Sequence, residues 1–293
     1  VIGLTGIMLI DVVTFIVAIL GVAIVHMPQP APEAPAADGK RPSLWQDSLY
    51  GFRYILARPS LLGLQFAFTA LNFISAFGGI IAVPMIQART ANNDASLATV
   101  ESIAAVGGVI GGLIMSTWGG PKRRVKGVLL GMSGESLLGP VVIGLSKAVP
   151  GWAAGSFMSQ LFIPIINGSN QAIWQSKVPP AVQGRVFATR RMIAQISFPV
   201  ALLMAGPLAD KVFEPAMSEG GALADSLGWL FGTGAGAGMS LMIFLSGLIG
   251  IAVGLIVYSI PAVRNVEDIL PDFDAVAAAA APVEAPVEIE PVA

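Results

Sequence analysis

Two carboxylates stand inside long apolar stretches of this sequence, where acidic residues are rare. Glu135 lies in the stretch 126–147 and Asp11 in the stretch 3–26. An ionisable side chain at membrane depth is costly and usually faces a cavity or a partner group. A buried carboxylate can also bind and release protons near neutral pH. Both residues are therefore candidates for proton coupling; the alternative is a hydrogen bond that pairs neighbouring helices.

A second set of candidates consists of amide and aromatic side chains in two other apolar stretches. Four of them recur at i, i+3, i+4 and i+7, on one face of a helix: Asn167, Asn170, Gln171 and Trp174. Three more make a weaker face of the same kind: Gln65, Asn72 and Phe73. Amides beside an aromatic ring suit a pocket for a lipophilic, partly polar ligand. Equally, such amides can hydrogen-bond neighbouring helices to one another.

The elements that must position these residues are membrane-spanning helices. The chain is 55% hydrophobic and 12% charged, whereas a soluble domain carries about 25% charged residues. Seven apolar stretches each approach the ~20 residues that a helix needs to cross a bilayer: 3–26, 61–86, 98–118, 126–147, 151–174, 190–212 and 236–260. The sequence predicts an all-α polytopic membrane protein with about seven transmembrane helices, and its first partner is the lipid bilayer.

The basic residues predict the orientation. All of the 16 Lys and Arg except Arg89, Lys147 and Lys211 fall in the linker 27–60, the loops 119–126 and 177–191, or the C-terminal tail. An excess of Lys and Arg in short loops marks the cytoplasmic face. We therefore expect a cytoplasmic C-terminus and an outward loop at 213–235, in a bacterial inner membrane.

Four segments follow from this layout. Residues 1–27 form one transmembrane helix, 28–60 a cytoplasmic linker, 61–260 a six-helix bundle, and 261–293 a cytoplasmic tail whose end is disordered. Within the linker, four apolar residues recur with helical spacing: Trp45, Leu49, Phe52 and Leu56. This pattern predicts an amphipathic helix that lies at the membrane interface.

Composition also argues against several kinds of chemistry. The chain has no Cys and a single His, His26, which argues against disulfides, thiolate catalysis and His- or Cys-ligated metal sites. We expect no cofactor, no metal and no enzymatic activity, although a membrane enzyme acting on lipids stays a possible class. The basic clusters follow from topology, so no nucleic-acid partner is expected.

A glycine-rich segment followed by three cations closes the stretch 98–118. It reads GGLIMSTWGGPKRR over 111–124 and includes Lys122, Arg123 and Arg124. At a membrane rim these cations can pair with acids or helix C-termini on a neighbouring element and latch one conformation. The alternative is that they only set the orientation.

The chain resembles the C-terminal part of a major facilitator superfamily transporter, in particular its macrolide-efflux and siderophore-exporter-like branch. Gly112, Ser116 and Gly119 with the three cations resemble the second-half loop motif, although Ser116 stands where an acid is usual. The segments 171–210 and 261–272 resemble the tenth-to-eleventh helix region and the C-terminal end of this branch. The resemblance implies that residues 1–27 correspond to helix 6 and 61–260 to helices 7–12, while helices 1–5 have no counterpart here.

The resemblance implies a secondary active transporter, of which this chain is a fragment. Its partners would be protons, a small amphipathic substrate such as a drug, macrolide or siderophore, and a missing N-terminal bundle or a partner membrane subunit. The substrate would leave the cell by proton-coupled alternating access, as in multidrug antiporters. A non-transporting membrane subunit or assembly factor built on half of the fold is the alternative.

Overall fold

The computed structural model describes residues 3–24 and 44–273 and divides the chain into two units, Val1–Arg41 and Pro42–Ala293. The described part of the first unit is one helix, α1 (Gly3–Ile24). Over residues 8–21 its side chains are exposed, Asp11 among them. A helix that is apolar all round is stable only when lipid or protein covers it. The linker residues 25–43 and the tail residues 274–293 lie outside the described residues.

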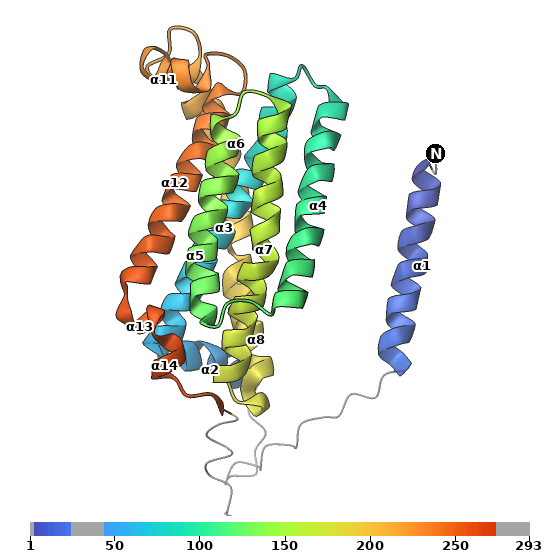
Figure 1. Ribbon diagram of the computed structural model, residues 1–293, viewed down its shortest axis with the longest axis vertical. Helices are drawn as coiled ribbons and strands as arrows, with labels where there is room; N and C mark the ends of the chain where they lie inside the picture. The colour runs from blue at the N-terminus through green and yellow to red at the C-terminus, as the bar shows by residue number, and fades with distance from the viewer. Residues whose placement is uncertain (1–2, 25–43, 274–293) are drawn as a thin grey trace, which may run out of the picture. The chain divides into compact units, whose positions relative to one another are not determined.

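The second unit is a bundle of helices that run side by side (Figure 1). Among the described residues, six helical segments are long and apolar enough to cross a membrane: α3 (Pro59–Arg89), α4 (Asp94–Trp118), α5 to α6 (Arg124–Leu145), α7 (Val149–Lys177), α8 to α10 (Pro180–Met217) and α12 (Ala237–Ser259). Their bounds agree with the six predicted stretches to within a few residues at most ends. The prediction of an all-α polytopic membrane protein is confirmed.

The fifth of these segments begins ten residues earlier than the sequence predicts. Helix α8 (Pro180–Gln195) starts directly after Pro179 and is followed by α9 (Ser197–Leu208), η2 (Ala209–Phe213) and α10 (Glu214–Met217). The prediction of a loop over 177–191 is wrong. Pro180 occupies the first helical turn, where a missing N–H costs nothing and the fixed φ favours a helix. The pair Pro179-Pro180 therefore ends α7 and also starts α8.

Short helices lie at both ends of the bundle. At one end are α2 (Leu44–Leu56), α13 (Pro261–Arg264) and α14 (Val266–Ile269), and at the other is α11 (Ala224–Phe231) (Figure 1). Helix α2 packs on α8 and buries Tyr54 and Ile55, whereas Leu49 and Leu56 stay exposed. Two residues of the predicted apolar stripe, Leu49 and Leu56, are thus free to meet a membrane surface, while Phe52 is half-buried.

The tightest pair of helices is α4 and α7. A Cβ atom on Gly107 would overlap the carbonyl oxygen of Phe157, and one on Gly111 would overlap that of Leu161. Lipid gives no hydrophobic drive for helices to associate, so van der Waals contact at small residues holds membrane helices together. The spacing of four residues between Gly107 and Gly111 puts both on the face that meets α7.

Two π-helical turns interrupt the spans. One, η1 (Leu137–Val141), separates α5 (Arg124–Ser136) from α6 (Val142–Leu145) and contains Pro140, and the other, η2, follows Pro207. Proline cannot donate the hydrogen bond of an α-helix, and single π-helical turns often accommodate such a defect.

Candidate binding cavity

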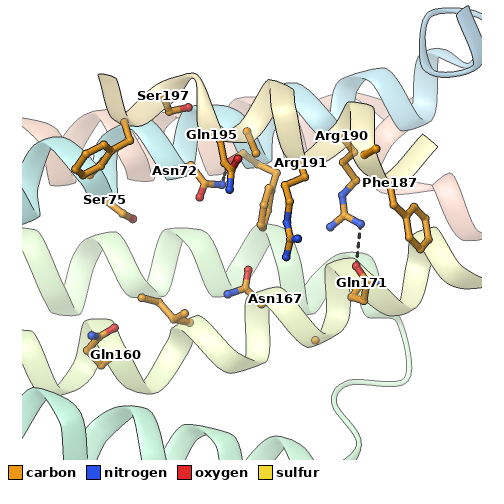
Figure 2. Close-up of a pocket in the computed structure, with 17 residues that line it drawn as sticks. Asn72, Ser75, Gln160, Asn167, Gln171, Phe187, Arg190, Arg191, Gln195 and Ser197 are labelled. Carbon is orange, nitrogen blue, oxygen red and sulfur yellow. Dashed lines mark hydrogen bonds between the residues drawn. The ribbon is translucent and has the colours of Figure 1, made fainter. Parts of the chain in front are cut away.

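A cavity of about 1160 Å³ lies between α3, α7, α8 and α9. Its apolar lining includes Phe68, Ile163, Phe187 and Phe198. Its polar lining is drawn in Figure 2: Asn72, Ser75, Gln160, Asn167, Gln171, Arg190, Arg191, Gln195 and Ser197. Pockets for drug-sized ligands usually measure about 300–1,000 Å³ and combine apolar walls with a few polar groups. This cavity has both the size and the composition of a ligand site.

One end of the cavity is formed by a buried guanidinium. The Arg190 side chain is only 9% exposed, and its Nη1 donates a hydrogen bond to Oε1 of Gln171 at 3.0 Å. Its guanidinium carbon lies 5.0 Å from the ring centre of Trp174, with Phe68 and Phe187 at 5.7 and 5.9 Å. Cation–π attraction of this kind stabilises a cation away from water. The aromatic rings therefore hold the Arg190 side chain at the cavity wall.

The predicted face of α7 is divided between the cavity and the core. Asn167 and Gln171 line the cavity, whereas Asn170 and Trp174 are fully buried and do not line it. Nε1 of Trp174 donates to Oδ1 of Asn170 at 3.2 Å. The reason is that α5 packs against the side of α7 that carries Ile166. Asn170 and Trp174 follow Ile166 on that side at intervals of four residues and are therefore buried in the core.

The second predicted face, on α3, is divided in the same way. Asn72 lines the cavity, although its Nδ2 donates to the carbonyl oxygen of Phe68 at 2.7 Å. Gln65 is buried, and its Nε2 donates to the carbonyl oxygen of Arg190 at 3.2 Å, which fixes α8 against α3. Phe73 lines a separate, almost entirely apolar cavity of about 610 Å³ between α3, α9 and α12.

Of the two candidate coupling acids, Glu135 belongs to the bundle and does not line this cavity. Glu135 is 3% exposed on α5 and accepts hydrogen bonds from the hydroxyls of Ser159 at 2.8 Å and Ser136 at 3.2 Å. No Lys or Arg among the described residues forms an ion pair with it. Ser159 belongs to α7 and directly precedes Gln160, which lines the cavity. Asp11, in the first unit, is exposed on α1.

The predicted loop motif ends α4 with two glycines in the left-handed region. Gly119 has φ +74° and Gly120 φ +86°, a conformation that favours glycine because it has no Cβ. Ser116 is exposed, and its hydroxyl donates to the carbonyl oxygen of Gly112 in its own helix. At this position, where an acid is usual in the resembled motif, the hydroxyl thus forms a hydrogen bond within its own helix.

Two of the three cations after this motif contact the bundle's own C-terminal segment and α7. Arg123 forms an ion pair with Asp268, and Arg124 donates to the carbonyl oxygen of Ala172 at 3.2 Å. Glu267 accepts hydrogen bonds from the backbone N–H groups of Arg124 and Val125, at the start of α5. A carboxylate at a helix N-terminus is stabilising because it satisfies free donors and the helix dipole. For Lys122 the described residues provide no ion pair.

Lys177 holds the same C-terminal segment from the other side. Its ammonium group donates to the carbonyl oxygens of Glu267 and Leu270 and forms an ion pair with Asp272 at 2.9 Å. The hydrogen bond from Lys177 keeps the pKa of the Asp272 carboxyl below its usual value. These contacts pack α13 and α14 against the ends of α5 and α7.

Sequence reasoning missed six polar residues of the cavity: Ser75, Gln160, Arg190, Arg191, Gln195 and Ser197. Gln160 lies seven residues before Asn167, so a longer helical pattern on α7 already contained it. Arg190 and Arg191 fall both in the predicted loop 177–191 and at the start of the predicted stretch 190–212. A helix that starts at Pro180 puts both well inside it.

The fold and the cavity define a multi-pass α-helical membrane protein with an amphipathic cavity between its helices. No family model matches the chain, and no solved structure is detectably similar to it. The chain is similar to the macrolide efflux protein A of Streptococcus pyogenes, and to the protein of that name from its serotype M6. In both comparisons 218 residues align at 25% identity, covering 71% of this chain and 51% of the relative. The chain thus spans about half the length of these curated relatives.

Proposed function

We propose that this protein is the substrate-binding half of a secondary active transporter of the major facilitator type, which exports a small amphipathic solute. The observation that carries the proposal is the cavity of about 1160 Å³, with aromatic walls and converging amides. In this proposal the cavity is part of a substrate site between two helical bundles, where transporters of this kind bind substrate. The similarity to macrolide efflux proteins suggests a drug-sized amphiphile as the substrate.

In the proposed mechanism this bundle is one wall of an alternating-access site. Helices α3, α7, α8 and α9 face the substrate in this proposal, and a second bundle supplies the opposite wall. Rocking of one bundle against the other opens the site to each side of the membrane in turn. The basic end of the bundle, with Lys122 and Arg123, faces the cytoplasm of a bacterial cell in this proposal.

Proton entry is proposed to drive export through Glu135. Its carboxylate accepts a hydrogen bond from Ser159 on α7, the helix that carries Gln160 and Asn167. Protonation removes the charge that Ser159 contacts and so changes the interaction between α5 and α7. Glu135→Gln is expected to abolish export against a gradient while substrate binding to the purified protein persists. Loss of both export and binding, or of neither, would count against a coupling role for Glu135.

The substrate site is tested by two neighbouring asparagines with different environments. Asn167 faces the cavity and has no hydrogen bond among the described residues, whereas Asn170 is buried and accepts from Trp174. Asn167→Ala is expected to weaken substrate affinity and efflux several-fold without changing the melting temperature. Asn170→Ala is expected to lower the stability by about 1–3 kcal/mol, because the Trp174 N–H loses its buried partner.

The readouts are efflux of a fluorescent amphiphile from cells expressing the protein, and thermal unfolding of the purified variants. If Asn167→Ala leaves affinity and efflux unchanged while the wild type transports, the cavity is not the substrate site. If cells with and without the wild-type protein retain the amphiphile equally over a panel of drug-like solutes, the transport proposal itself fails.

A further inference from the structure

The cavity carries a positive charge that its own walls do not neutralise. Arg190 is more than nine-tenths buried, and its contacts are an amide and three aromatic rings rather than a carboxylate. A buried cation is costly unless an anion or several hydrogen bonds accompany it. No Asp or Glu occurs among the described residues that line the cavity. A counter-charge is therefore missing from this part of the protein.

A second guanidinium lies next to the first. Arg191 lines the same cavity, and its side chain, like that of Arg190, is directed towards α7, the helix that carries Asn167 and Gln171 (Figure 2). Within residues 3–24 and 44–273 it has no hydrogen bond or ion pair, and it remains exposed to the cavity. Asn167 and Gln195 also present amides there without a hydrogen-bond partner among these residues.

This combination of groups is suited to an acidic head group. Guanidinium groups bind carboxylate, phosphate and sulfonate oxygens through paired, charge-assisted hydrogen bonds. The apolar part of such a ligand would lie along Phe68, Phe187 and Phe198, whose rings line the same cavity. An amphiphile with an amine would instead place its positive charge among two cations.

We propose that the cavity binds an anionic amphiphile, whose acidic group lies between Arg190, Arg191 and Asn167 while its apolar body covers the aromatic wall. The proposal rests on the proposed transport function and adds the charge class of the substrate to it. The same chemistry could come from a free amphiphile or from the head group of an anionic lipid, and the experiment separates these sources.

The test compares three ligands with the same chain and different heads: dodecanesulfonate, dodecanol and dodecylamine. Binding is measured to the protein in nanodiscs of zwitterionic lipid, with empty nanodiscs as background. The wild type is expected to bind the sulfonate about tenfold or more tighter than the alcohol, as charge-assisted hydrogen bonds predict. The amine is expected to bind more weakly than the alcohol.

The variants separate a binding role of the arginines from a structural one. Arg191→Gln is expected to fold normally, because Arg191 has no partner in the described structure, and to weaken sulfonate binding roughly tenfold while leaving alcohol binding unchanged. Arg190→Lys keeps the charge and is expected to retain most of the preference. Lys126→Gln removes the same charge at an exposed position outside the cavity and is the matched control, with no expected change.

The source of the ligand is tested by adding phosphatidylglycerol to the nanodiscs. If the lipid head group occupies the site, sulfonate affinity falls more for the wild type than for Arg191→Gln. An equal fall in both proteins identifies a free amphiphile as the ligand.

Equal binding of sulfonate and alcohol by the wild type overturns the proposal, and so does an unchanged preference in Arg191→Gln. If such a protein still exports neutral amphiphiles from cells, only the charge class is wrong. Preferential sulfonate binding without any efflux would instead contradict the transport function.

Discussion

The close approach of α4 and α7 predicts opposite effects for neighbouring glycine substitutions. A methyl group on Gly111 would overlap the backbone of Leu161, whereas one on Gly112 would meet no atom within 4 Å. The same contrast holds one turn earlier. A methyl group on Gly107 would overlap the backbone of Phe157, whereas one on Gly108 would lie 4.0 Å from its nearest neighbour, Cβ of Gln160. Each pair therefore offers a variant and a matched control in the same turn of the same helix.

The expected magnitude follows from two terms. Replacing Gly by Ala inside a helix is favourable by about 1 kcal/mol of intrinsic propensity. Overpacking against a rigid neighbour costs about 1–3 kcal/mol, and the neighbour here is backbone, which cannot rotate away. Propensity is common to both members of a pair, so their difference isolates the packing cost. Gly111→Ala should be less stable than Gly112→Ala by about 1–3 kcal/mol.

Thermal unfolding of the purified variants measures this difference. At about 2–4 °C per kcal/mol for a chain of this size, it corresponds to a gap of roughly 2–12 °C. Gly107→Ala and Gly108→Ala should repeat the result. The Gly111→Ala and Gly107→Ala variants should also lose efflux, because they displace α7, which carries the cavity residue Gln160. Equal melting temperatures within both pairs would refute the packing argument.

Three other predictions concern the ends of the bundle. Single cysteines introduced into this Cys-free chain at Lys122 and Glu219 should react with an impermeant maleimide from outside only at Glu219, and the reverse pattern would contradict the proposed orientation. Lys177→Met should raise the rate of amide hydrogen exchange in the C-terminal segment roughly tenfold, because charge-assisted hydrogen bonds are lost. Lys126→Met should leave this rate unchanged, and equal exchange in both variants would contradict the contacts described for Lys177. The pKa of Asp272 is lowered in the folded protein. Its ion pair therefore contributes fully to stability at pH values above the ordinary carboxyl pKa, and this contribution is lost as the pH falls through the lowered pKa. Exchange in this segment should therefore increase on acidification in the wild type, whereas Asp272→Asn should not show this pH-dependent step.

The residues of the candidate site could be predicted only in part. Asn167, Gln171 and Asn72 were found from sequence because polar side chains in apolar spans are conspicuous and helical spacing relates them. Asn170 satisfies the same spacing, yet it lies in the core. A helical face predicted from spacing does not specify where the neighbouring helix packs, and here α5 decides that boundary. Arg190 could not be assigned to the cavity from sequence, since its closest polar neighbours come from α3 and α7.

The sequence by itself determined the class of protein and the number and approximate bounds of the spans in the bundle. Crossing a bilayer requires about 20 apolar residues whatever the helix packs against, so this property is local and can be read without a partner. The tertiary structure decided which residues share a cavity and which of the cations pair with acids. Gln65 and Arg190, 125 residues apart, are joined by one hydrogen bond, and Arg123 pairs with Asp268, 145 residues away. Such contacts depend on the crossing and rotation of whole helices, which no local pattern specifies.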